Sequence, residues 1–282
     1  MLSRIDETFA RLRADGQTGL VTYVTAGDPD GDRSALILQT LDQAGADILE
    51  VGIPFSDPLA DGPVIQRASE RALAAGTTLK SSLRLIEAVR PMISSPIVVF
   101  TYNNPVVAMG LERFMRRAAD VGVDGILVLD LPIEEAGELR DAATAFKIDP
   151  IFLLSQTTTE DRIRRAAELG RGFLYGISRL GVTGERDTIA EGAFRMVKRI
   201  RKLTALPVAV GFGISRPEHV AEVGRFADAA VVGSGLVSRI AEASDTCDLT
   251  GKVRQYVRWL KSGLRASKTS GGERGSPNDE QQ

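Results

Sequence analysis

A glutamate near the end of a predicted strand is the first candidate for chemistry in this sequence. The strand spans residues 46–51, and alternation along it puts Glu50 on the face opposite to Leu49 and Val51. If the face with Glu50 points into an apolar interior, burial disfavours the charged carboxylate and suits the group to proton transfer. The alternative interpretation is a structural ion pair between Glu50 and an arginine.

The loop that follows this strand contains two further carboxylates. Residues 52–63 include three prolines and two glycines, which make the loop stiff, and they also include Asp57 and Asp61. A long, rigid, acidic loop placed by a scaffold is more typical of a site than of a linker. For either aspartate alone, simple capping of a turn is an equally good explanation.

Three glycine-rich segments follow the last three predicted strands, at residues 181–184, 211–213 and 233–235. Glycine lets a phosphate approach backbone N–H groups, and a helix that begins just after the last segment adds its dipole. Glycine also occurs in ordinary turns, so each segment alone is a weak signal. Together, in this order, they predict a phosphate site.

The rare residue types exclude several mechanisms. The chain has one histidine, His219, and one cysteine, Cys247, so an intramolecular disulfide, a cysteine zinc cluster and a site with several histidine metal ligands are impossible. No lysine lies at the carboxyl end of a predicted strand, so a Schiff-base mechanism has no evident nucleophile. His219, within residues 217–223, is predicted to be a surface helix residue. Metal-free acid–base chemistry by carboxylates on a phosphorylated substrate remains.

The elements that must position these residues alternate between short apolar runs and helical patterns. Consecutive apolar positions are typical of parallel strands that are buried on both faces. We predict eight such strands, at residues 20–25, 46–51, 97–101, 125–129, 150–154, 172–177, 208–211 and 228–232. Helical patterns lie between them, for example at residues 34–43, 111–120, 160–169 and 192–203. Eight units favour an α/β fold of the (β/α)₈ TIM barrel type over an open doubly wound sheet.

Both ends of the chain differ from this repeating pattern. Leu2, Ile5, Phe9 and Leu12 lie on one face of an extra helix at the N-terminus. Residues 266–282 contain one alanine and no larger apolar residue, so we predict a disordered polar tail after a single barrel domain of residues 1–265. Trp259 recurs at helical spacing with buried-type neighbours and is predicted to lie in the core.

The charge balance narrows the possible partners. The 282 residues include 35 Lys plus Arg and 37 Asp plus Glu, for a net charge of −2, which does not favour binding to nucleic acid or to an anionic membrane. No apolar run approaches the ~18 residues of a membrane span, and no signal peptide is visible. The default expectation is a cytoplasmic protein.

The loop motif is specific enough to identify a resemblance. The stretch LEVGIPFSDPLADGP at residues 49–63 resembles the signature of the tryptophan synthase alpha chain family. The similarity covers roughly residues 1–266 and continues through residues 25–29, 130–132, 181–184 and 211–215. It implies a (β/α)₈ barrel that cleaves indole-3-glycerol phosphate to indole and glyceraldehyde 3-phosphate.

The resemblance also implies roles for individual residues. Glu50 would be the acid–base catalyst, and Asp61 would stabilise positive charge at the indole N–H. Thr183 would meet Asp61 when its segment closes over the site. Members of the family more often have phenylalanine where Tyr23 stands, so this wall of the pocket carries an extra hydroxyl. The substrate pocket would comprise Tyr23, Phe100, Tyr102, Tyr175 and Phe212, and the phosphate contacts would be Gly184, Gly213, Gly233 and Ser234.

A partner follows from the same resemblance. The family works with a beta chain that contains pyridoxal phosphate and condenses indole with serine, in an expected α2β2 heterotetramer. Residues 54–61 and 101–107 resemble the surface that faces this partner. The present chain would need no cofactor or metal of its own.

Two other functions compete with this lyase. A sugar-phosphate isomerase on the same barrel would also use carboxylates and a phosphate site, but the loop signature argues against it. A non-catalytic regulatory subunit would only bind and activate a partner, and the retention of both Glu50 and Asp61 argues against that.

Overall fold

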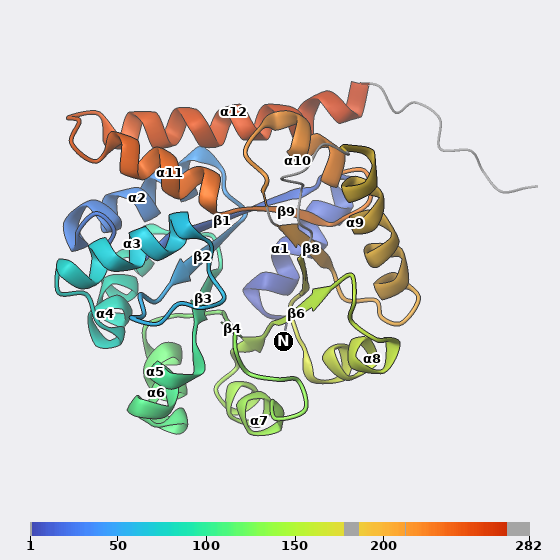
Figure 1. Ribbon diagram of the computed structural model, residues 1–282, viewed down its shortest axis with the longest axis horizontal. Coiled ribbons are helices and arrows are strands. Elements are labelled where there is room, and N and C mark those ends of the chain that lie inside the picture. Colours follow the sequence, from blue (N-terminus) through green and yellow to red (C-terminus); the bar gives the residue numbers. More distant parts are fainter. Residues whose placement is uncertain (1, 178–185, 212, 270–282) are drawn as a thin grey trace, which may run out of the picture.

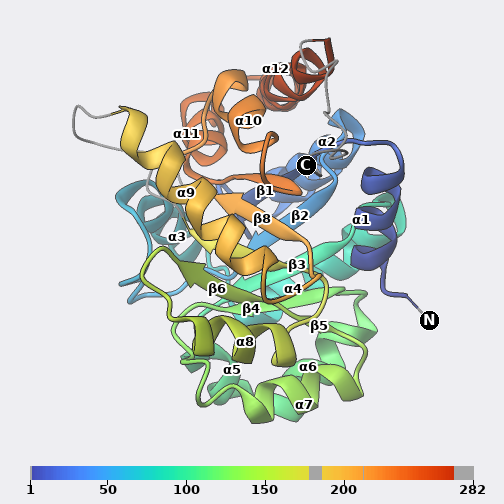
Figure 2. The same ribbon diagram turned by 90° about the vertical axis from the view of Figure 1, so that its right-hand side faces the viewer.

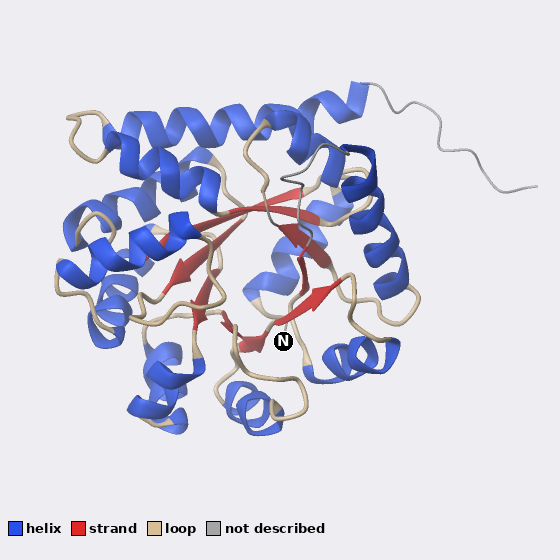
Figure 3. Ribbon diagram, in the orientation of Figure 1, coloured by secondary structure: helices blue, strands red, loops and turns tan. Residues whose placement is uncertain are grey.

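The computed structural model describes residues 2–177, 186–211 and 213–269. Parallel strands form a ring at the centre, and helices surround the ring (Figures 1 and 3). The prediction of an α/β barrel is therefore confirmed. The strands are β1 (Gly19–Thr25), β2 (Ile48–Gly52), β3 (Ile97–Thr101), β4 (Gly125–Val128), β5 (Asp149–Pro150), β6 (Phe152–Ser155), β7 (Leu174–Ile177), β8 (Val208–Gly211) and β9 (Ala229–Val232).

The order of the strands excludes the open doubly wound sheet. The order is β5-β4-β3-β2-β1-β9-β8-β7-β6, so neighbours in the chain are neighbours in the sheet. The predicted strand at 150–154 is divided, because β5 pairs with β4 whereas β6 pairs with β7. Between them, the N–H of Ile151 donates to the carbonyl of Ile126 at 2.8 Å. The chain itself therefore closes the ring at Ile151.

Most of the helices lie on the outside of this ring, as Figure 3 shows. The predicted helix at 34–43 begins earlier, at Gly31, because Asp30 caps its N-terminus by accepting the N–H of Arg33. The helices are α1 (Arg4–Ala14), α2 (Gly31–Ala44), α3 (Pro63–Ala74), α4 (Leu79–Val89), α5 (Asn103–Met109), α6 (Leu111–Asp120), α7 (Gly137–Ala145), α8 (Glu160–Leu169), α9 (Arg186–Arg201), α10 (Pro217–Val223), α11 (Ser234–Ala243) and α12 (Leu249–Thr269), with a 3₁₀ turn at Arg90–Met92.

Helix α1 closes the end of the barrel where the strands begin. Ile5, Phe9 and Leu12 are buried in the same apolar cluster as inward residues of the strands, whereas Leu2 is exposed. The rings of Phe9 and Phe173 lie 5.7 Å apart. In Figure 2, α1 lies on the right, at this end of the barrel. The opposite end, where the strands finish, is the one available for a site.

A repeated junction connects helices to the strands that follow them. Gly45 and Gly122 have φ values of 96° and 83°, a left-handed conformation that lets each helix end and the chain turn. The carboxylates of Asp47 and Asp124, two residues later, accept the N–H groups of Leu20 and Ile97 on neighbouring strands. These contacts fix the strands in the order that the barrel requires.

The last helix corrects one expectation. Trp259 is 45% exposed on α12, although Val253 and Leu260 are fully buried. Its ring packs beside that of Tyr256 at 5.8 Å, at the border of the buried stripe, so regular spacing did not place it in the core. Helix α12 continues to Thr269, and residues 270–282 of the predicted tail lie outside the described residues.

Candidate active site

Strand β2 places Glu50 inside the barrel. Ile48, on the same face, belongs to the inner apolar cluster, whereas Leu49 and Val51 belong to the outer one beneath the helices. Glu50 is 0% exposed, and within the described residues neither of its carboxylate oxygens has a hydrogen-bond partner. Burial raises the pKa of this carboxyl to about 8. At neutral pH the group therefore holds a proton that it can donate.

The loop after β2 brings a second carboxylate to the end of the barrel where the strands finish, here called the mouth. The hydroxyl of Tyr102 donates to Oδ2 of Asp61 at 3.0 Å and accepts the N–H of Ala60 at 3.0 Å. Gln66, in the first turns of α3, donates to the backbone carbonyl of Asp61 at 2.9 Å. Burial raises the pKa of Asp61 to about 6, although the hydrogen bond from Tyr102 opposes this shift. Asp61 is therefore mostly ionised at neutral pH, while Glu50 is mostly neutral.

The other loop aspartate does not join the site by any contact that the structure records. Asp57 is exposed, and its carboxylate accepts the hydroxyl of the adjacent Ser56 at 2.6 Å. This contact joins two side chains and is not the capping of a turn by a backbone N–H. The sequence pattern could not separate Asp57 from Asp61, because both stand in the same loop with the same residue type.

Aromatic side chains form the walls around Glu50. The rings of Tyr23 and Phe100 meet edge to face, with centroids 5.2 Å apart at 75°. After burial, the charge of Glu50 is the largest influence that raises the pKa of Tyr175. Burial and then the charge of Asp61 raise the pKa of Tyr23, and the charge of Glu50 adds to this, so Tyr23 lies near both carboxyls and Tyr175 near Glu50. Tyr102, whose hydroxyl donates to Asp61, is the fourth predicted aromatic residue that the structure brings to this site. The fifth, Phe212, lies outside the described residues.

Two glycines make room for these phenols, although their sequence context indicated other roles, Gly52 in the stiff loop and Gly211 in a phosphate-binding segment. A Cβ on Gly52 would lie 2.1 Å from the Tyr23 hydroxyl, and a Cβ on Gly211 would lie 2.5 Å from the Tyr175 hydroxyl. Any side chain at either position would collide with a wall of the pocket. The sequence signal that could have identified this role is a glycine at the end of a strand, on the face that points into the barrel.

Two of the three glycine-rich segments, which follow β8 and β9, lie at the same end of the barrel. Strands β8 and β9 are neighbours, so Gly213, which has a φ of 80°, and Gly233 follow adjacent strand ends. Gly233 is the N-cap of α11, and the exposed Ser234 is its first residue. The first N–H groups of a helix are free to bind an anion. Thr183 and Gly184 lie outside the described residues.

His219 lies on α10, where its ring nitrogen Nδ1 accepts the N–H of Ser215 at 3.4 Å, as suits a structural residue.

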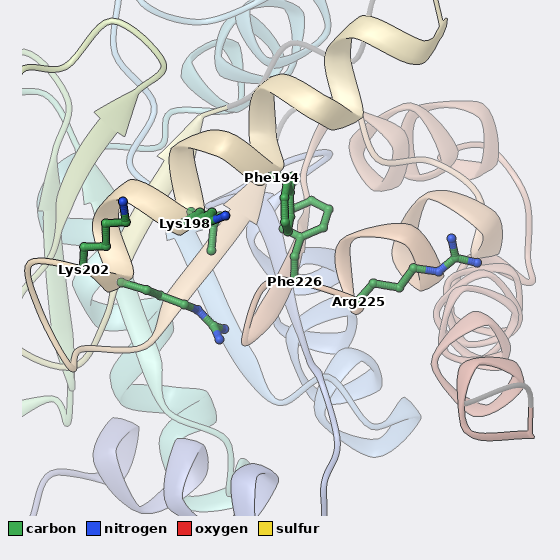
Figure 4. A pocket seen from close by; sticks show the side chains of 7 residues that line it. Phe194, Lys198, Lys202, Arg225 and Phe226 are labelled. Carbon is green, nitrogen blue, oxygen red and sulfur yellow. The ribbon is translucent and has the colours of Figure 1, made fainter. Parts of the chain in front are cut away.

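A separate surface hollow holds none of the predicted site residues. In Figure 4, Arg225 points away from Lys198 and Lys202, so these cations do not converge on one ligand. The hollow is lined by Phe194, Val197, Lys198, Arg201, Lys202, Arg225 and Phe226.

The described part of the chain brings together no group of three His, Cys, Asp or Glu residues that could hold a metal ion. None of the helices in that part is long and apolar enough to cross a membrane.

Comparisons with known proteins agree with one another. The sequence model of one family, described as Tryptophan synthase alpha chain, matches residues 9–264. A relative of that name from Geotalea daltonii is 48% identical over 265 residues, which cover 94% of this chain and 100% of the relative. The relative from Arabidopsis thaliana is 42% identical over 261 residues, covering 92% and 95%.

Solved structures give the same result. Tryptophan synthase subunit alpha from Legionella pneumophila superposes with a TM-score of 0.87 at 32% identity, covering 94% of this chain and 100% of that one. A chain of Mycobacterium tuberculosis tryptophan synthase superposes with a TM-score of 0.85 at 34% identity, covering 94% and 99%.

Proposed function

Because this chain belongs to the tryptophan synthase alpha chain family, a lyase family that cleaves indole-3-glycerol phosphate to indole and glyceraldehyde 3-phosphate, we propose that Glu50 and Asp61 catalyse the cleavage. The observation that carries the proposal is the state of Glu50. It is a carboxyl group buried in the mouth of the barrel, with a raised pKa and no partner for either oxygen among the described residues.

One carboxyl group can account for both proton transfers. Neutral Glu50 donates its proton to carbon C3 of the indole, and the ring becomes a cation. The resulting carboxylate then removes the proton from the hydroxyl on the carbon attached to C3. The electron pair of that O–H bond forms the aldehyde, the C3–carbon bond breaks, and its electron pair returns to the ring. Glu50 is protonated again, so the protons and charges balance.

Asp61 stabilises the cation that exists between these two transfers. Its carboxylate is mostly ionised at neutral pH and is held by the Tyr102 hydroxyl at the end of a braced loop. A fixed negative charge near the indole N–H lowers the energy of the cationic ring without any reorganisation of water. Burial raises the pKa of Glu50 further than that of Asp61. At neutral pH Glu50 is therefore the acid and Asp61 is the anion.

The phosphate of the substrate binds at the other side of the mouth in this proposal. The backbone N–H groups of Gly233 and Ser234, at the start of α11, would bind the phosphate together with the backbone of Gly213. The predicted contacts of Thr183 and Gly184 complete the site. With the phosphate fixed there, the indole ring extends toward the aromatic walls and the two carboxyls.

The partner of an alpha chain is the beta chain of tryptophan synthase, which receives the indole. We propose an α2β2 assembly in which pyridoxal phosphate belongs to the beta chain. Exposed apolar residues on two adjoining segments support the predicted docking surface: Leu59 is 92% exposed and Val107 is 63% exposed. Tyr102 connects the two segments through Phe55, 5.1 Å away between ring centroids, and through Asp61.

The expected cytoplasmic location also stays a proposal, which fractionation of cells would test.

The test is an indole-producing assay of the chain in complex with the beta chain. We expect Glu50→Gln, which removes the titratable proton at constant size, to lower kcat by ~10²–10⁴-fold. We expect Asp61→Asn to lower it by about 10²-fold, because the charge is lost while the shape is kept. Glu112→Gln, on the exposed face of α6, is the matched control and should keep full activity. Unchanged kcat in Glu50→Gln would refute the assignment.

A further inference from the structure

Among the strand residues that flank Glu50, one carries a polar group. In the register of the parallel strands, Glu50 lies opposite Tyr23 on β1 and opposite Val98 on β3. Ile48 and Gly52 precede and follow it on the same face of β2. The phenol of Tyr23 is therefore the one hydrogen-bonding group that the neighbouring strand positions offer to this carboxyl.

The Tyr23 side chain leans over β2 toward the mouth of the barrel. Its hydroxyl occupies the place of the missing Cβ of Gly52, only 2.1 Å from where that atom would be. Gly52 lies two residues beyond Glu50, which is about 7 Å along the strand. A glutamate side chain that extends toward the mouth covers about half of this distance. Rotation about the side-chain bonds of Glu50 can therefore bring its carboxylate to the phenol.

Neither group has a good partner where it stands. The Tyr23 hydroxyl lies 3.5 Å from Oγ1 of Thr25, beyond the usual range for two hydroxyl oxygens. Both oxygens of Glu50 are buried without a hydrogen bond within the described part of the chain. A buried polar atom that makes no hydrogen bond is costly, so such a pair is favourable as soon as Glu50 becomes charged.

We propose that Tyr23 is a positioning residue for Glu50, and that its hydroxyl turns from Thr25 to donate a hydrogen bond to the Glu50 carboxylate when that carboxylate forms. This inference rests on the proposed function, in which Glu50 gives its proton to carbon C3. The bond stabilises the anion that remains at the moment when the ring cation is made. A phenylalanine could not supply it.

The other titratable groups around Glu50 have different positions. The charge of Asp61 also acts on Tyr23, but the carboxylate of Asp61 already accepts the hydroxyl of Tyr102. The charge of Glu50 acts on Tyr175 of β7, whose hydroxyl lies against Gly211 of the adjacent strand β8. Tyr175 is therefore the competing donor, and the experiment includes it.

The test compares single variants of the chain in complex with the beta chain. Tyr23→Phe keeps the ring and removes the hydroxyl. We expect kcat to fall about tenfold with little change in KM, and the alkaline limb of the kcat profile to move up by about one pH unit. The sign follows because a hydrogen bond to the carboxylate lowers the pKa of Glu50, so its loss raises that pKa.

Thr25→Val is the matched control, since it removes the other partner of the same phenol at constant shape. A hydroxyl with a purely structural role would produce equal effects in Thr25→Val and Tyr23→Phe. We expect instead that Thr25→Val leaves the alkaline limb in place or lowers it. A limb that moves in Tyr175→Phe and not in Tyr23→Phe would overturn the proposal.

A spectroscopic titration gives a readout that does not depend on activity. The infrared C=O band of the protonated Glu50 carboxyl is identified by its loss in Glu50→Gln, and its disappearance with rising pH reports the pKa. We expect this pKa to be about one unit higher in Tyr23→Phe. Equal values refute the proposal for Tyr23. Loss of activity in Glu50→Gln then still supports the proposed catalyst, so the two failures are distinguishable.

Discussion

At the residue scale, the orientation of a side chain was predictable where a strand determines it. Alternation along β2 predicted that Glu50 lies on the face opposite to Leu49 and Val51, and the structure shows that this face is the inner one. The partner of Asp61 was not predictable in this way. The contact with Tyr102 depends on the path of a loop, and residue types alone do not determine that path. The absence of any partner for Glu50 among the described residues likewise became visible only in three dimensions.

The two carboxyls predict a bell-shaped pH profile for the cleavage. Asp61 must be ionised to stabilise the cation, so the rate should rise as the pH passes about 6. Glu50 must be protonated to act as the acid, so the rate should fall as the pH passes about 8. Measurement of kcat/KM from pH 5 to pH 10 tests this, because this ratio reports the pKa values of the enzyme without substrate. In Asp61→Asn the acidic limb should disappear while the alkaline limb remains. Persistence of both limbs in that variant would assign the acidic limb to another group.

At the element scale, helices with a clear apolar stripe were predicted best. Helix α1 was expected from four apolar residues at helical spacing, and three of them, all except the exposed Leu2, close one end of the barrel. The capping of α1 was not expected. Ser3 accepts the N–H of Asp6, and its hydroxyl also donates to Asp149 at 2.5 Å across the bottom of the barrel. That second contact spans 146 positions in the chain, and local sequence patterns hold no information about such a distance.

The burial of Asp149 beside α1 predicts a pH-dependent stability. Burial raises the pKa of Asp149 to about 6, with the Ser3 hydrogen bond opposing and the charges of Asp6 and Asp124 adding to the shift. The folded chain thus binds this proton more tightly than the unfolded chain, whose aspartate titrates near 3.9. The stabilisation is complete below that pH and is lost as the pH rises through about 6.

Asp149→Asn removes this titration and is compared with wild type by urea unfolding at pH 5 and pH 8. Relative to the variant, wild type should lose about 1 kcal/mol of unfolding free energy between the two pH values. A difference that is the same at both pH values would show that Asp149 has an ordinary pKa in the folded chain.

At the scale of the whole molecule, the number of βα units and their repeated junctions led to the barrel. The repeat did not reveal how the ring closes. The passage from β5 to β6 was predicted as one strand because its residues are apolar without interruption, and the division at Ile151 follows from pairing with two different neighbours. Pairing with two different neighbours follows from the closure of the ring, which the apolar pattern of a single strand does not contain.

One end of the barrel is packed by α1, and the other end holds the candidate site. Substitutions at the two ends should therefore change stability and activity independently. Phe9→Ala, at the end closed by α1, opens space beside Phe173 and should lower the unfolding free energy by about 3–5 kcal/mol. Its kcat/KM, measured well below the unfolding temperature, should stay unchanged because the strands lie between Phe9 and the mouth. Asp61→Asn should lower kcat by about 10²-fold without lowering the unfolding free energy, because it removes a carboxylate whose charge is disfavoured by burial. The double variant should show both effects at full size, because sites without shared contacts add. Reduced kcat/KM in the folded Phe9→Ala chain would mean that packing at the closed end controls the geometry of the site.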